Sequence, residues 1–277
     1  MPSRRRVSLP PTALLVTGAA GGVATAVRAT LRREFSDIRL TDRRRPRQLA
    51  RGERFVPAEL ADPAAVDRAV RGVSAIVHFG GIASDGTLSA LAPSNVAGVD
   101  HLLDAAIRHR VRRVVLASSM HVCGKYARDE PVTAASPPRP DSCYAVTKLY
   151  AETRARSAST NAGLSVVVLR LGHVIGRREH AEPDNWLHPT DLARLLCVAV
   201  RAPDIGYECW HVVTDGDAAA ESRAMLRERF GFAFTVVAPL DAVARAAALR
   251  WWYPDDPIAR QYRGGVFASG RATVPSR

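Results

Sequence analysis

Short apolar runs alternate with longer stretches of helical spacing along most of the chain. The apolar runs predict buried strands at residues 13–17, 38–41, 54–56, 75–79, 113–117, 164–171 and 209–213. The stretches between them predict helices from residue 22 to about residue 35 and at residues 63–70, 95–110, 143–158 and 190–201. Strands that alternate with helices form a parallel sheet with helices on both faces. The pattern therefore predicts an α/β fold with a doubly wound parallel sheet.

The chain reads as one domain. No internal repeat, linker or break in composition divides its 277 residues. We expect a single domain over residues 12–277 and a loose basic arm at residues 1–11. The substrate-binding elements should come mainly from residues 172–190 and from a small C-terminal cap. The basic start followed by an apolar run imitates a secretory signal, but cleavage there would remove the first strand of the fold. We therefore expect this strand to be retained.

The formal net charge of +12 by itself suggests a nucleic-acid partner. The arginines are scattered along the sequence, however, and neither a zinc-finger spacing nor an aromatic RNA-binding box accompanies them. The four cysteines form no C-x-x-C pair, and no apolar stretch reaches the length of a membrane span. We expect no specific nucleic acid, no membrane and no metal, and a cytoplasmic protein with reduced thiols.

A glycine-rich turn, residues 18–23, joins the first strand to the first helix. Its glycines allow a tight turn and let backbone N–H groups approach a pyrophosphate at the start of the helix. The next strand ends at Asp42, about 20 residues further on, where an acidic residue binds the adenosine ribose of a dinucleotide. These features predict a Rossmann-type site for NAD. NADP stays possible, since Arg43 or Arg44 could hold a 2′-phosphate, and Asp42 could simply close its strand.

Tyr144 and Lys148 lie one helical turn apart and share one face of their predicted helix. An ammonium beside a phenol in a dry cleft favours the phenolate, which would lower the pKa of the tyrosine from about 10 and make it a usable base. Lys125 and Lys148 are the only lysines among 39 Lys+Arg residues, which argues against coincidence. The alternative is a helix surface on which tyrosine and lysine are mere neighbours.

Together with Ser118 and Ser119, which follow a strand at the ligand-binding edge of such a sheet, these motifs resemble an extended short-chain dehydrogenase/reductase. This branch contains the NAD-dependent epimerases and dehydratases, and within it the chain is most similar to uronate dehydrogenases. The likeness rests on Thr17-Gly18-Ala19-Ala20-Gly21, Asp42, His78-Phe79-Gly80-Gly81-Ile82, Asn95, Ala117-Ser118-Ser119-Met120-His121, Arg139-Pro140-Asp141-Ser142-Cys143-Tyr144, Lys148 and Tyr262-Arg263-Gly264-Gly265-Val266-Phe267.

The resemblance implies roles for these residues. Tyr144 would take the proton of a substrate hydroxyl, Lys148 would lower the pKa of Tyr144 and bind the nicotinamide ribose, and Ser119 would donate a hydrogen bond to the reacting oxygen. The cofactor would contact Gly18, Ala20, Gly21, Gly22, Val23, Asp42, Arg43, Glu59, Leu60, Phe79, Gly80, Gly81, Asn95, Ala117, Ser118, Tyr144, Lys148 and Leu171. The substrate would contact Ala83, Ser119, Met120, His121, Tyr144, His173 and Arg177.

The substrate side departs from the pattern of uronate dehydrogenases. Ala83, Met120 and His173 stand where the resemblance leads us to expect serine, asparagine and serine. Each replacement removes a small polar group expected to contact sugar hydroxyls or a carboxylate. The arginine that clamps the carboxylate has no clear counterpart: Arg177 or Arg178 could serve, or both could be solvated surface residues.

Three functions remain open. The first is an NAD-dependent dehydrogenase that oxidises a hydroxyl of a sugar or sugar acid. The second is a nucleotide-sugar epimerase or dehydratase, for which a chain of 277 residues leaves little room for a nucleotide-sugar domain. The third is a non-catalytic dinucleotide-binding regulatory protein, which the altered pocket favours and the retained Ser119, Tyr144 and Lys148 disfavour. The resemblance also implies a homodimer or a larger homo-oligomer.

Overall fold

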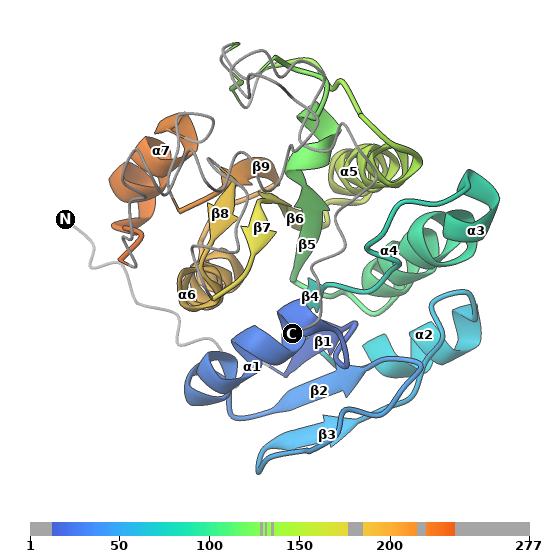
Figure 1. Ribbon diagram of the computed structural model, residues 1–277. Helices are drawn as coiled ribbons and strands as arrows, with labels where there is room; N and C mark the ends of the chain where they lie inside the picture. Colours follow the sequence, from blue (N-terminus) through green and yellow to red (C-terminus); the bar gives the residue numbers. More distant parts are fainter. Residues whose placement is uncertain are drawn as a thin grey trace, which may run out of the picture.

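A seven-stranded sheet in the order β3-β2-β1-β4-β5-β6-β9 forms the centre of the computed structural model (Figure 1). Its strands are Leu14–Thr17 (β1), Ile38–Thr41 (β2), Glu53–Phe55 (β3), Ala75–His78 (β4), Arg113–Ser119 (β5), Ser165–Leu171 (β6) and Tyr207–Val212 (β9). All six pairings within this sheet are parallel. The predicted doubly wound α/β fold is confirmed, with the reversal of strand order between β1 and β4.

The structure describes residues 13–127, 130, 132–133, 136–176, 185–214 and 220–235. The predicted basic arm at residues 1–11 lies outside the described residues. The same holds for residues 236–277, which make up most of the predicted C-terminal cap, and for Arg177 and Arg178. None of the helices in the described segments is long and apolar enough to cross a membrane.

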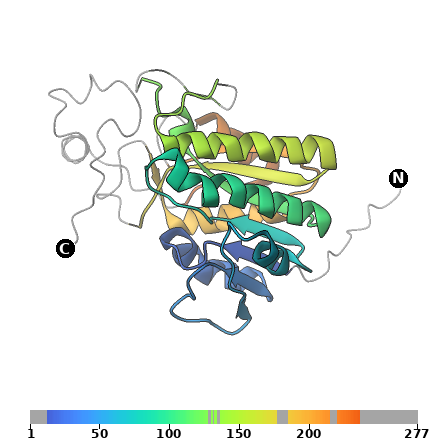
Figure 2. The same cartoon turned by 90° about the vertical axis from the view of Figure 1, so that its right-hand side faces the viewer.

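Helices cover both faces of the sheet (Figure 2). The helices α1 (Gly22–Glu34) and α6 (Pro189–Arg201) pack on one face, and α2 (Pro63–Val70), α4 (Gly98–Arg108) and α5 (Cys143–Ala162) pack on the other. Within β1, Leu14 and Val16 belong to the first core, whereas Leu15 belongs to the second. Because both faces are buried, the strands are apolar at successive positions and do not alternate with polar residues.

The helix α5 is well defined at both ends, which matters because it carries Tyr144 and Lys148. The Ser142 side chain accepts a hydrogen bond from the backbone N–H of Ala145 and caps the first turn. At the other end, Gly163 adopts a left-handed conformation with φ of 67° and ends the helix. The cap places Tyr144 in the first helical turn, at the same edge of the sheet as the end of β5.

Several elements differ from the sequence prediction. The helix predicted at residues 95–110 corresponds to the end of a π-helical turn η1 (Pro93–Ala97) and to α4, and a short helix α3 (Leu88–Ala92) that was not predicted precedes them. A 3₁₀ turn η2 (Met120–Cys123) follows β5, and two short strands, β7 (His173–Val174) and β8 (Trp186–Leu187), form a separate parallel pair. A further helix, α7 (Ala220–Phe230), follows β9. Strands of two residues are too short to give a periodic signal in the sequence.

His78 closes β4 in a fully enclosed position. Its ring is 1% exposed, and its Nδ1 lies 2.7 Å from the Thr17 hydroxyl oxygen, which also accepts the backbone N–H of Gly80 at 3.0 Å. Burial lowers the pKa of His78 to about 3, and the nearby Lys148 charge acts in the same direction. The folded protein therefore holds His78 neutral and uses it to brace the turn that follows β4.

This burial predicts a pH dependence of stability. The unfolded chain binds a proton at His78 near pH 6.5, whereas the folded chain binds it only near pH 3. The contribution of neutral His78 to the free energy of unfolding is therefore complete above about pH 6.5 and is lost as the pH falls toward 3. His78→Asn should flatten the dependence of the free energy of unfolding on pH between about 4.5 and 6.5. Urea unfolding of the original protein and of His78→Asn over this pH range tests the prediction. Identical slopes of the free energy of unfolding against pH would contradict it.

Candidate active site

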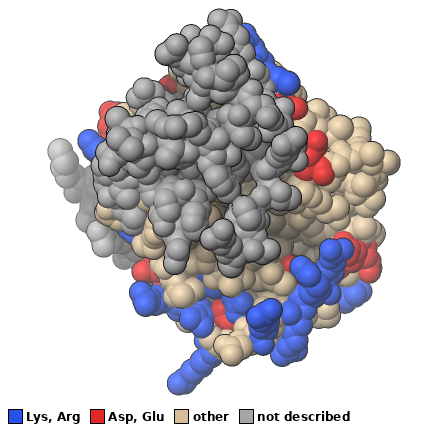
Figure 3. All heavy atoms as spheres, viewed as in Figure 1, with Lys and Arg blue, Asp and Glu red and all other residues tan. Residues whose placement is uncertain are grey.

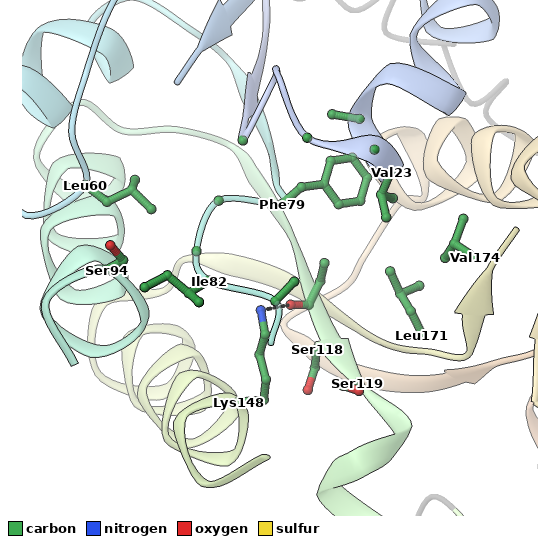
Figure 4. Close-up of a pocket in the computed structure, with 18 of the residues that line it drawn as sticks. Val23, Leu60, Phe79, Ile82, Ser94, Ser118, Ser119, Lys148, Leu171 and Val174 are labelled. Atoms are coloured by element: carbon green, nitrogen blue, oxygen red, sulfur yellow. Dashed lines mark hydrogen bonds between the residues drawn. The ribbon is translucent and has the colours of Figure 1, made fainter. Parts of the chain in front are cut away.

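A cavity of about 430 Å³ opens at the carboxyl ends of β1, β2, β4, β5 and β6 (Figure 4). The glycine-rich turn lines one end, and the start of α5 lines the other. Of the predicted cofactor residues, those that line the cavity are Gly18, Gly21, Gly22, Val23, Asp42, Arg43, Glu59, Leu60, Phe79, Gly80, Gly81, Ala117, Ser118, Tyr144, Lys148 and Leu171. One continuous cavity thus joins the predicted dinucleotide site to the predicted catalytic residues.

The glycine-rich turn has the shape of a dinucleotide cradle. Gly18 has φ of 65°, and a Cβ atom there would lie 2.8 Å from backbone atoms of Phe79 and Gly80. By contrast, a Cβ atom on Gly22 would meet nothing within 4 Å, so the start of α1 faces open space. No side chain caps this end of α1, which leaves the N-terminal end of the helix available to an anionic group. These residues fit the pyrophosphate of a dinucleotide.

Asp42 is held in place at the end of β2. Its two carboxylate oxygens accept the backbone N–H groups of Ala20 and Arg44, each at 3.0 Å. The Ala20 N–H is therefore used within the protein, and Ala20 does not line the cavity. Arg43 and Arg44 line the rim beside the carboxylate. In Figure 3 the described basic side chains gather along the lower part of this face, on the side where Figure 1 shows β2 and β3.

Asn95 lies behind the cavity wall. Its side-chain oxygen accepts the backbone N–H of Ile82 at 2.7 Å, and its side-chain nitrogen donates to the Ile82 carbonyl at 3.0 Å and to the Thr147 hydroxyl at 3.1 Å. The π-helical turn η1 carries this residue inward between the loop after β4 and α5. Asn95 does not line the cavity and instead supports the loop that does.

Ser119, Tyr144 and Lys148 all line the cavity. The Lys148 Nζ atom donates a hydrogen bond to the Ala117 carbonyl oxygen at 3.0 Å (Figure 4) and lies 5.6 Å from the centre of the Tyr144 ring. The structure therefore brings the three predicted catalytic side chains from β5 and α5 to one place. They are not mere neighbours on an exposed helix surface.

The pKa of Tyr144 differs from the sequence expectation. Burial raises it to about 12, although a hydrogen bond from Ser119 opposes the rise. Burial also lowers the pKa of the Lys148 ammonium to about 8, and the negative charge of Glu152 opposes this fall. The expectation that Lys148 brings Tyr144 toward neutral pH was wrong for the protein without ligands. Desolvation of the phenol has the largest effect on the pKa of Tyr144. The Lys148 ammonium donates its hydrogen bond to the Ala117 carbonyl and not to the phenol.

Four of the predicted substrate contacts outside the catalytic group lie in the described part of the chain, and three of them line the cavity. Ala83, His121 and His173 line the cavity. Met120 does not, because its side chain is buried against Val213. His121 is held by a 2.8 Å contact between its Nδ1 and Asp141, and its ring meets the Tyr144 ring edge-on with centroids 5.9 Å apart.

Several lining residues were not predicted. They include Ile82, Ser94, Gly172, Val174 and Asn185. Ile82 and Ser94 belong to the loop and π turn whose path the sequence does not indicate. Val174 belongs to β7, and Asn185 directly precedes β8. Both strands are too short to predict from the sequence. Gly172 could have been inferred from its neighbour Leu171, because it comes directly after β6.

The fold and this cavity define a Rossmann-type dinucleotide-binding protein with a Ser-Tyr-Lys site. Residues 14–196 match the model of the NAD dependent epimerase/dehydratase family, and the chain belongs to this family. It is 37% identical over 281 residues to a uronate dehydrogenase of Pseudomonas syringae pv. tomato, with 98% of each chain covered. A uronate dehydrogenase of Pseudomonas putida is 34% identical, with 92% of this chain and 95% of the relative covered.

Solved structures give the same result. The uronate dehydrogenase from Agrobacterium tumefaciens matches with a TM-score of 0.70 at 28% identity, over 83% of this chain and 91% of that one. A mutant of the same enzyme complexed with NAD also matches with a TM-score of 0.70. A glucuronic acid dehydrogenase from Chromohalobacter salexigens matches with a TM-score of 0.68 at 28% identity, over 88% and 98% of the two chains. The predicted resemblance is confirmed.

The cradle predicts a specific cost for Gly18→Ala. The new methyl group would overlap the backbone at Phe79 and Gly80, and the left-handed φ disfavours any side chain. Gly72→Ala is the matched control, since Gly72 has φ of 75° and nothing within 4 Å of a Cβ atom. Gly72→Ala should lower the free energy of unfolding by about 1 kcal/mol, and Gly18→Ala should lower it by clearly more. Equal losses in urea unfolding would contradict the close contact.

Proposed function

We propose that this protein is an NAD-dependent dehydrogenase that oxidises a hydroxyl group of a sugar acid, as uronate dehydrogenases do. The observation that carries the proposal is the single cavity that joins the Gly18 cradle to Ser119, Tyr144 and Lys148. The relatives named above support a sugar acid over the alternatives of nucleotide-sugar epimerase and regulatory protein. The similarity to the Pseudomonas syringae uronate dehydrogenase extends over 98% of each chain, which also supports a free sugar acid.

NAD would lie along the cavity with its pyrophosphate at the start of α1 and its adenosine ribose beside Asp42. The open space at Gly22 admits the phosphates, and the fixed carboxylate of Asp42 retains lone pairs for ribose hydroxyls. Ala117 and Leu171 line the part of the cavity next to the catalytic side chains. When bound, NAD accepts a hydride, and its positively charged nicotinamide ring favours a phenolate nearby.

The residues of this chain then have complementary tasks. Tyr144, as phenolate, takes the proton from the substrate hydroxyl, while Ser119 donates a hydrogen bond to the same oxygen as it becomes a carbonyl. Lys148 holds the nicotinamide ribose and stabilises the phenolate by its charge.

The substrate side supports a sugar acid held by an altered set of contacts. His121, fixed by Asp141, and His173 both line the cavity and can bind hydroxyl or carboxylate oxygens. Ala83 lines it without a polar group, and Arg177 stays a candidate for the carboxylate. We infer that the enzyme binds a uronic acid with a pattern of hydrogen bonds different from that of its relatives. A homodimer or larger homo-oligomer and a cytoplasmic location belong to the same proposal.

Purified protein with NAD and a panel of uronic acids, neutral sugars and nucleotide sugars tests the function. Reduced cofactor, followed by its absorbance, should form with at least one free uronic acid. Product without net reduction of NAD would favour the epimerase or dehydratase. No product with any compound, despite binding of NAD, would favour the regulatory protein.

Tyr144→Phe should abolish turnover, because the ring is retained while the proton acceptor is lost. Its affinity for NAD should stay within about threefold of the original, since the phenol contributes little to binding the cofactor. Tyr150→Phe is the matched control: it lies on the same helix, but its hydroxyl donates to Asp100 on α4 at 2.7 Å. The initial rate of NAD reduction and a fluorescence titration of NADH measure both effects. Full activity in Tyr144→Phe would remove Tyr144 from its role.

Asp42→Ser should shift the preference from NAD toward NADP. The substitution removes a charged acceptor for the ribose and its repulsion of a 2′-phosphate, while Arg43 and Arg44 remain at the rim. We expect kcat/KM for NAD to fall by about tenfold or more and the ratio of NAD to NADP efficiency to fall further. An unchanged ratio would show that Asp42 only closes the strand.

A further inference from the structure

A buried ion pair lies directly behind the catalytic residues. Glu152 belongs to α5, one turn beyond Lys148, and is 4% exposed, while Arg170 belongs to β6 and is 5% exposed. One oxygen of the Glu152 carboxylate accepts a hydrogen bond from Arg170 Nε at 3.0 Å, and the other accepts one from Arg170 Nη2 at 2.8 Å. Its first oxygen also accepts the Ser118 hydroxyl at 2.5 Å. One carboxylate thus joins α5 to both β5 and β6.

The far side of Arg170 is also occupied. Its Nη1 donates to His211 Nε2 at 3.0 Å and to the Cys123 sulfur at 3.3 Å. Since a guanidinium can only donate, His211 accepts at Nε2 and is neutral. Burial raises the pKa values of the Cys123 and Cys209 thiols near this pair, so that both stay protonated. Among the described residues named here, Glu152 carries a negative charge and Arg170 a positive charge.

The same carboxylate completes a clamp on the end of β5. Lys148 donates to the Ala117 carbonyl, and Glu152, one turn later on α5, accepts the Ser118 hydroxyl. Two consecutive strand residues are thus held by two consecutive turns of one helix. The next strand residue is Ser119, which lines the cavity with Tyr144. The clamp fixes the position of Ser119 relative to Tyr144.

Glu152 also determines the charge balance around Lys148. The groups that face Lys148 are Tyr144 and Glu152 on its own helix, His78 on β4 and the Ala117 carbonyl on β5. His78 is neutral, because burial lowers its pKa to about 3, and Tyr144 is neutral, because burial raises its pKa to about 12. Among these four groups, Glu152 carries the negative charge.

We propose that Glu152 is a positioning residue of the active site, which aligns Ser119 through Ser118 and holds Lys148 as an ammonium through its buried negative charge. The proposal deepens the function proposed above, because the tasks of Ser119 and Lys148 are those assigned there. A merely structural ion pair between Glu152 and Arg170 would stabilise the fold without affecting the titration of Lys148. This difference makes the two roles separable.

The composition of the chain provides a direct test. Lys125 and Lys148 are the only lysines, so NMR of protein labelled with ¹³C at the lysine side chains gives two signals. Lys125 is exposed and serves as the internal reference. In Glu152→Gln the Lys148 signal should titrate about one pH unit lower than in the original protein, since an opposite charge nearby is lost. An unchanged Lys148 midpoint would overturn the electrostatic part of the proposal.

Two further variants keep the test decisive. Glu34→Gln, which removes an exposed carboxylate paired with Arg201, is the control and should leave the Lys148 midpoint unchanged. If Glu152→Gln does not fold because it leaves Arg170 buried without its partner, the double variant Glu152→Met with Arg170→Met removes both charges. That variant should shift the Lys148 midpoint in the same direction by a smaller amount, and no shift would overturn the electrostatic part.

Ser118→Ala tests the alignment separately. It keeps the charge of Glu152, so the Lys148 midpoint should stay in place, while kcat with a uronic acid at saturating NAD should fall about tenfold. Unchanged kcat would overturn the alignment part. If the original protein reduces no NAD with any sugar acid, the proposed function fails, whereas the lysine titration still decides the role of Glu152.

Discussion

The hydrogen bond from Lys148 to the Ala117 carbonyl is the contact on which the active site depends. Apart from this bond and the bonds of Glu152 to Ser118 and Arg170, the facing surfaces of α5 and the sheet are largely apolar, and apolar surfaces allow small shifts of one element along another. A buried polar contact is different, because an ammonium or a carbonyl left without a partner is costly. This contact therefore fixes α5 against β5 and brings Ser119, Tyr144 and Lys148 to one cavity.

Most of the fold could be predicted, because strands buried on both faces appear as continuous apolar runs between helical stretches. The Gly18 cradle and the Tyr144–Lys148 spacing could also be predicted, since each is a local pattern. The direction in which a side chain points is not local. Ala20, Asn95 and Met120 belong to the predicted motifs yet do not line the cavity, because their groups bond or pack within the protein. The π turn and the two-residue strands leave no periodic pattern.

The electrostatics of the site depend on burial, which the sequence does not supply. A lysine one turn from a tyrosine predicts a phenol of lowered pKa, but Tyr144 is deep enough that desolvation dominates and its pKa rises to about 12. In the proposed reaction the positive charge of the nicotinamide ring would therefore have to favour the phenolate in addition to Lys148.

The central claim is that a substrate carbon gives up a hydride within this cavity while Tyr144 takes the proton of the attached hydroxyl. Deuterium tracing tests it most directly, with a uronic acid deuterated at the carbon that is oxidised and unlabelled NAD. The account predicts one deuterium on the nicotinamide ring of each reduced cofactor, together with a slower reaction of the deuterated substrate if the transfer limits the rate. Deuterium found in the solvent, or retained in the product, would contradict it.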